Sequence, residues 1–149
     1  MLEIRFGFLF LAVIAFLFGP VIAFSAGFLT NMLGFLMFSA GGVFNPLFDL
    51  NVGLMGVIYA VFLYKRNHKS EYFIIWVAAA QILVNVVCRI IINTHLLMIM
   101  GFIPADSTNI VTTIRLFRNI TLLPVEILML LFILKFVAVY AKRYNFIKD

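Results

Sequence analysis

The sequence predicts an all-α fold, an integral membrane bundle of four transmembrane helices that forms a single domain over residues 1–149. Of the 149 residues, 65% are hydrophobic and only 11% are charged, whereas a soluble domain of this size needs far more polar surface to cover its core. The chain carries four long apolar runs, and a spanning helix needs about 20 mainly apolar residues. Between Phe6 and Phe48 no residue is charged.

The first predicted span is Gly7–Phe24, in which Pro20 would produce a kink. We read this span as a retained helix rather than a cleaved signal peptide. The next stretch, residues 25–48, is apolar but interrupted by glycines and polar side chains. It predicts an interfacial or re-entrant segment between helices 1 and 2. A fifth crossing is the alternative, and it would leave almost no loop before the following span.

The second predicted span is Asn45–Tyr64. Asn45 can cap this helix, and Pro46 suits its first turn. Small residues on one face predict close contact with a neighbouring helix. They are Gly53, Gly56 and Ala60.

The third predicted span is Tyr72–Met100, and the fourth begins near Ile110 with Pro124 inside it. The basic residues at the ends of the spans fall on one predicted side of the membrane: Arg5, Lys65, Arg66, Lys69, Lys142, Arg143 and Lys148. The loops on the other side, residues 25–44 and 101–109, hold no Lys or Arg. Positive residues favour the inner side, so both termini are expected in the cytoplasm. The expected location is the inner (plasma) membrane of the cell, with the mitochondrial inner membrane as the alternative.

A polar stripe runs along the third predicted span. Its residues follow one another at intervals of four, which places them on one face of a helix. They are Gln81, Asn85, Arg89 and Asn93. At 1.5 Å rise per residue, Arg89 would lie roughly 10 Å below the outer boundary. Exposure to lipid at that depth would cost several kcal/mol, so the stripe must face other helices or a wet cavity.

The fourth predicted span carries a matching stripe, with Arg118 beside it. Its residues are Thr112, Arg115, Asn119 and Glu126. Because the two spans run in opposite directions, Glu126 is expected at a depth within reach of Arg89. The third and fourth spans should therefore pack stripe against stripe, with Arg89 and Glu126 as an ion pair.

An ionisable cluster inside a membrane indicates a functional site. The predicted ligand-binding set is Gln81, Asn85, Arg89, Arg115, Arg118, Asn119 and Glu126. With Asp49 and Asn51 at the outer end of the second span, the arginines would form a positive pocket. Such a pocket suits a phosphate head group, a carboxylate or a polar quinone ring. The alternative is structural: the stripes only hold the helices together, and Arg115 and Arg118 extend to the interface.

Several chemistries are excluded by what the chain lacks. Cys88 is the only cysteine, which rules out an intramolecular disulfide and a multi-cysteine metal site. His68 and His95 are expected on opposite sides of the membrane, so they cannot share a haem. There is no nucleophile elbow, no pair of catalytic carboxylates and no phosphate-binding loop. We therefore expect no cofactor, no metal, no enzymatic activity and, despite the net charge of +5, no nucleic-acid partner.

Four short motifs occur in the order "VGLMGVIYAVFLY", "VCRII", "GFIP" and "PVEILML". This order resembles the small four-helix bacterial membrane proteins called DoxX-like, over roughly residues 49–136. The resemblance implies a compact bundle in which Arg89 and Glu126 are the shared polar positions. It implies no reaction.

These observations predict a non-enzymatic membrane protein with a polar site in the outer leaflet. The site would bind a membrane lipid or a quinone-like amphiphile, or the chain would be a subunit of a larger membrane complex or a homo-oligomer. The alternative is a small transporter or channel for anions or protons, with Glu126 as the protonatable group. The apolar inner half argues against a continuous path; its residues include Phe62, Leu63, Ile74 and Ile75.

Overall fold

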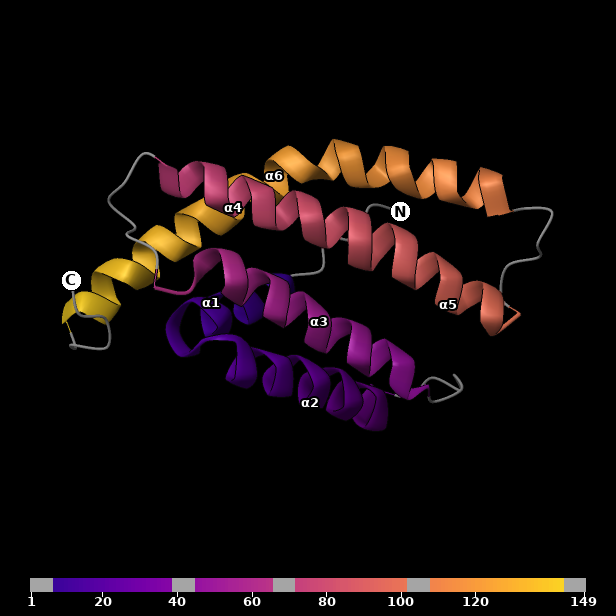
Figure 1. The fold of residues 1–149 in the computed structure, drawn as a ribbon, viewed down its shortest axis with the longest axis horizontal. Helices are drawn as coiled ribbons and strands as arrows, with labels where there is room; N and C mark the ends of the chain where they lie inside the picture. The colour runs from indigo at the N-terminus through magenta and orange to yellow at the C-terminus, as the bar shows by residue number, and fades with distance from the viewer. Residues whose placement is uncertain (1–6, 39–44, 66–71, 102–107, 144–149) are drawn as a thin grey trace.

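A computed structural model describes residues 7–38, 45–65, 72–101 and 108–143. The helices are α1 (Gly7–Phe18), α2 (Pro20–Phe38), α3 (Pro46–Leu63), α4 (Tyr72–Leu83), the π-helix η1 (Val84–Ile92), α5 (Asn93–Ile99) and α6 (Thr108–Arg143). The segments α4, η1 and α5 continue one another as a single rod (Figure 1). The described residues contain no strand, so the all-α prediction is confirmed.

Within the part of the chain that the structure describes, four helical segments are long and apolar enough to cross a membrane, which agrees with the predicted number of spans. They are Pro20–Met37, Pro46–Leu63, Tyr72–Ile99 and Ile110–Arg143. Several of the basic residues that predict the orientation lie outside the described residues, namely Arg5, Arg66, Lys69 and Lys148. His68 and most of the turn between the third and fourth spans also lie outside them. The orientation of the termini therefore stays a prediction.

The first crossing differs from the prediction. Instead of a kinked helix over Gly7–Phe24, the chain reverses at Gly19, whose φ of +86° is a left-handed conformation that favours glycine. Leu11 and Gly27 lie eight residues on either side of Gly19, and a Cβ on Gly27 would lie 3.2 Å from Leu11 Cδ1. The short helix α1 is therefore folded back against α2 as a hairpin.

The spanning helix of this hairpin is α2, which begins at Pro20 because proline suits a first helical turn. Residues 25–38, expected in an interfacial or re-entrant segment, belong to α2 instead. Residues 39–44 of that expected segment lie outside the described residues. In a uniformly apolar run, hydropathy alone does not distinguish a bent helix from a reversal.

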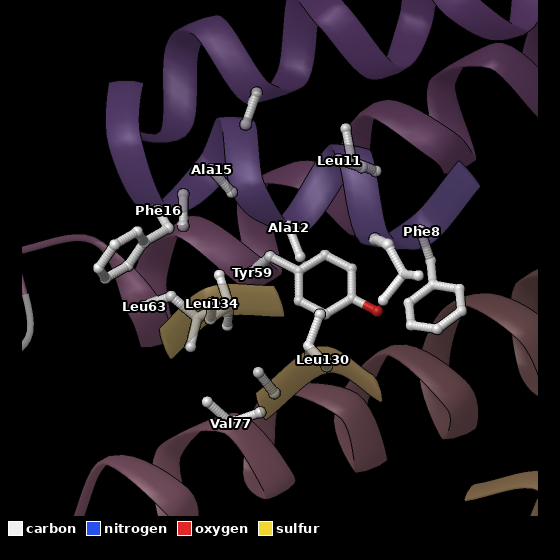
Figure 2. Packing of buried hydrophobic residues seen from close by; sticks show 14 of the residues in the cluster. Phe8, Leu11, Ala12, Ala15, Phe16, Tyr59, Leu63, Val77, Leu130 and Leu134 are labelled. Atoms are coloured by element: carbon white, nitrogen blue, oxygen red, sulfur yellow. The ribbon is translucent and has the colours of Figure 1, made fainter. Parts of the chain in front are cut away.

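The hydrophobic core surrounds α1 (Figure 2). This 12-residue helix packs against α2, α3 and α6. The fully buried core side chains include Ala12, Ala15, Tyr59, Leu63, Val77, Leu130 and Leu134. Leu63, one of the apolar residues that argue against a continuous polar path, belongs to this core.

The contact between α2 and α3 depends on glycine. A Cβ on Gly56 would lie 2.5 Å from the carbonyl oxygen of Ala23, and one on Gly27 would lie 2.8 Å from that of Val52. Backbone therefore meets backbone, as small residues permit between membrane helices. This confirms the close helix contact predicted for the second span.

Two local predictions also hold. Asn45 Oδ1 accepts a hydrogen bond from the backbone N–H of Leu47 at 2.9 Å, and Pro46 opens α3. Pro124 lies inside α6, and that helix changes direction along its length (Figure 1), as expected where proline removes a helical hydrogen bond.

Candidate functional site

The side chain of Glu126, on α6, accepts hydrogen bonds from three residues of the third span. Its Oε2 accepts from Gln81 Nε2 at 2.6 Å and from Asn85 Nδ2 at 3.1 Å. Its Oε1 accepts from Arg89 Nη1 at 2.5 Å. The two polar stripes do pack against each other, and Arg89 and Glu126 form the predicted ion pair.

The polar network extends from this carboxylate in two directions. Tyr59 on α3 donates its hydroxyl proton to Gln81 Oε1 at 2.6 Å, and Arg89 Nη1 also donates to Asn85 Oδ1 at 3.0 Å. Gln81 and Asn85 are at most 1% exposed. A network whose buried members are paired in this way holds its geometry, because each broken bond would leave an unsatisfied polar group in an apolar surrounding.

Asn85 and Arg89 lie on the π-helix η1, which the sequence did not predict. π-Helical turns are rare and often occur at functional sites. Asn51 Nδ2, on α3, donates to the carbonyl oxygen of Cys88 at 3.1 Å and so ties this segment to its neighbour. A spacing of four polar residues is equally compatible with an α-helix, so the sequence carries no signal for the wider turn.

A cavity of about 820 Å³ lies beside the Arg89–Glu126 pair. This volume is within the range of pockets that hold drug-sized ligands. Residues of α1, α2, α3, η1, α5 and α6 line it. The polar lining residues are Thr30, Asn31, Asn45, Asp49, Arg89, Asn93, Arg115, Arg118, Asn119 and Glu126, and the aromatic ones are Phe8, Phe10, Phe35 and Phe48.

Most of the predicted site residues meet at this cavity. Those that line it are Arg89, Arg115, Arg118, Asn119 and Glu126. Gln81 and Asn85 do not line it and instead hold Glu126 through the hydrogen bonds described above. Asn93 of the predicted stripe also lines the cavity, whereas Thr112 and Asn51 do not. Whether the lining residues bind a ligand stays a prediction.

The sequence reasoning missed the contribution of α1 and α2. Asn31 Nδ2, on α2, donates to Asp49 Oδ1 at 2.6 Å. The ring of Phe8, on α1, lies over the Arg89 guanidinium, whose central carbon is 5.3 Å from the ring centroid. Asn31 is a polar residue inside the long charge-free run, and that was the available signal. A polar residue in such a run indicates an interrupted helix as readily as a position in a site.

The cavity has a positive bias. Three arginines and two carboxylates line it, a formal surplus of one positive charge. Arg115 Nη1 lies 3.5 Å from Thr94 Oγ1, and Arg89 neutralises Glu126 directly. Among the described residues no group of three His, Cys, Asp or Glu side chains could hold a metal ion. The site is therefore suited to binding an organic molecule with anionic character.

Comparison with known proteins matches this chain to one family profile and to one curated relative. The family profile of the ECF-type riboflavin transporter S component matches residues 1–140. The folate transporter FolT of Clostridium novyi (strain NT) is 33% identical over 84 residues, which is 56% of this chain and 48% of the relative. The match thus spans about half the length of that curated relative.

These findings correct the DoxX-like resemblance, which is wrong: the family profile matches almost the whole chain, whereas the resemblance depended on four short apolar motifs. They also favour the transport alternative over a lipid- or quinone-binding module. S components are substrate-binding transport proteins of the bacterial plasma membrane. They are transport components rather than enzymes. The match over residues 1–140 shows that the chain belongs to the family of ECF-type riboflavin transporter S components.

Proposed function

We propose that this chain is the substrate-binding component of a vitamin transporter and binds its substrate in the cavity beside Arg89 and Glu126. The observation that carries the proposal is the cavity itself. It is large enough for a vitamin-sized molecule, and most of the predicted polar site residues line it.

Within the cavity we assign different roles to the polar residues. Arg115, Arg118 and Asn119 line it from α6 and would contact the substrate. Arg89 and Glu126 neutralise each other and would form one wall of the site. Gln81 and Asn85 would position Glu126 through the hydrogen bonds that they donate to it.

We infer that the substrate is a carboxylated heteroaromatic vitamin of the folate kind. The formal positive surplus favours an anionic ligand, and guanidinium groups match carboxylates in shape and charge. Phenylalanine rings line the same cavity and suit an aromatic ring system. The relative from Clostridium novyi is named a folate transporter.

Riboflavin is the second candidate, because the matching family carries its name. Riboflavin has no carboxylate, so it would use the aromatic lining but leave the positive surplus without a counter-charge. For either substrate, transport would depend on partner membrane subunits, since the matching family is named as one component of a transporter.

Binding of tritiated folate and riboflavin to the purified full chain in lipid nanodiscs tests the proposal. We expect saturable folate binding that is tighter than riboflavin binding. Arg118→Gln should weaken folate binding by about tenfold or more, because a charge-assisted hydrogen bond is lost. Lys135→Gln is the matched control, since Lys135 is an exposed cation on the same helix that does not line the cavity.

Each alternative result has a definite meaning. Tighter binding of riboflavin than of folate would replace the first candidate with the second. Binding of neither vitamin would contradict the proposed function. An equal loss of affinity in Arg118→Gln and Lys135→Gln would show that net charge, rather than the cavity, controls binding.

A further inference from the structure

Asp49 is a buried carboxylate at the start of α3. It is 1% exposed and lines the cavity. Its Oδ1 accepts the hydrogen bond from Asn31 Nδ2 at 2.6 Å. Its Oδ2 has no hydrogen-bond partner within the part of the chain that the structure describes.

A buried carboxylate oxygen without a donor is unusual, because most buried polar groups are hydrogen-bonded and an unpaired one destabilises the fold. The first turn of a helix favours a negative charge, which helps α3 to hold Asp49 there. Asn31 fixes the direction of the side chain. Neither contact satisfies Oδ2, so a residue of the cavity wall lacks one hydrogen-bond donor.

Asn51 provides an internal comparison. Its Oδ1 is also buried without a partner, but Asn51 does not line the cavity. Its Nδ2 donates to the carbonyl oxygen of Cys88, so this residue has a clear structural role in joining α3 to η1. Asp49 differs because its unpaired oxygen belongs to a residue of the cavity wall.

We propose that Asp49 is a specificity-determining residue whose Oδ2 accepts a hydrogen bond from N–H donors on the ring of the substrate. This inference rests on the proposed function and adds the chemistry of the ring to it. The substrate would then carry an N–H donor edge for Asp49 and a carboxylate for the arginines that line the same cavity.

This pairing distinguishes the two candidate vitamins. A pterin ring presents an amino group next to a ring N–H, so Asp49 Oδ2 would meet two adjacent donors. A flavin ring presents one N–H between two carbonyl oxygens. The partial negative charges of these oxygens repel a carboxylate. Asp49 therefore favours the pterin ring, and the exocyclic amino group is the donor whose removal should matter most.

Competition against tritiated folate tests the assignment, with unlabelled folate and 2-desaminofolate as the two competitors. The wild-type chain should prefer folate by about ten- to a hundredfold, the range expected for one hydrogen bond to a charged group. In Asp49→Asn the carboxylate is lost while the shape is kept. The preference should then fall to within about threefold.

Two further variants separate recognition from folding. Asp49→Ser replaces the same carboxylate with a smaller group and should lose the preference in the same way, which covers the case in which Asp49→Asn does not fold. Asn51→Ala should lower the thermal stability but keep the full preference for folate. Size-exclusion profiles and thermal unfolding report whether each variant is folded.

The outcomes separate this inference from the proposed function. Wild-type chain that binds folate but does not distinguish 2-desaminofolate would overturn the role of Asp49 and leave the proposed function intact. A preference that survives in the folded Asp49 variants would do the same. Failure of the wild-type chain to bind folate would overturn the pterin assignment together with the folate proposal on which it rests.

Discussion

Arg89 on η1 and Glu126 on α6 are joined by a hydrogen-bonded ion pair, with Nη1 and Oε1 2.5 Å apart. Their side chains are 19% and 7% exposed, respectively. The pair thus joins the third and fourth spans at a point where one side meets the buried network and the other meets the cavity. A pair in this position affects both stability and ligand binding, and the two effects can be separated by mutation.

Breaking the pair from one side should be more damaging than removing both charges. Glu126→Gln leaves the Arg89 guanidinium without its counter-charge, and loss of one partner of a buried pair costs roughly 3–5 kcal/mol. The double variant Arg89→Gln/Glu126→Gln should recover much of that loss. Thermal unfolding in detergent measures the difference. Strictly additive losses would mean that the two residues do not interact.

The pairing could be predicted from the sequence because its signal is periodic. Spacings of four in one span and of three, four and seven in the other place polar residues on single faces. An apolar surrounding then leaves few alternatives to mutual contact. The same spacing places Arg115 and Asn119 at the site, with Arg118 beside their stripe, and all three line the cavity.

Other parts of the site could not be predicted, because they depend on backbone geometry rather than on periodicity. The reversal at Gly19 brings Phe8 and Asn31 to the cavity, but a glycine in an apolar run does not reveal its φ angle. The π-helical turn that contains Arg89 is likewise not marked by any residue pattern that would distinguish it from an α-helix. The sequence places Asp49 beside the expected pocket, whereas its unpaired oxygen is evident only from the contacts.

The reversal at Gly19 should be sensitive to any side chain. With φ at +86°, an added Cβ is strained, and it would also lie 3.1 Å from Cζ of the Tyr64 ring. We expect Gly19→Ala to reduce the free energy of unfolding by about 1–2 kcal/mol or more. Gly34→Ala is the control, because Gly34 lies within α2 with no atom within 4 Å of the added carbon. Equal thermal stability of the two variants would contradict the hairpin.

The two glycines of α3 should respond differently to the same substitution. In Gly56→Ala the new Cβ meets the carbonyl oxygen of Ala23 at 2.5 Å, and this backbone group cannot move without displacing α2. In Gly53→Ala the nearest atom belongs to the Phe24 ring at 2.8 Å, which can rotate away. We expect Gly56→Ala to cost several kcal/mol, as overpacking at a rigid contact does, and Gly53→Ala to cost clearly less. Chemical or thermal denaturation of both variants in one detergent measures the two losses of stability. A larger loss in Gly53→Ala than in Gly56→Ala would show that α2 and α3 do not approach each other through Gly56.

The orientation of the bundle decides from which side a substrate reaches the cavity. Basic residues follow α3 and end α6, and they favour the cytoplasmic side. Asp106 lies between the third and fourth spans, and Arg115 and Arg118 are close to the start of α6, so the cavity should open toward the outer side. Reporter fusions at Asp149 and at Asp106 should therefore score inside and outside, respectively. The opposite pair of scores would place the cavity on the cytoplasmic side, where it could not bind a vitamin from outside the cell. That result would contradict both the orientation and the proposed uptake function.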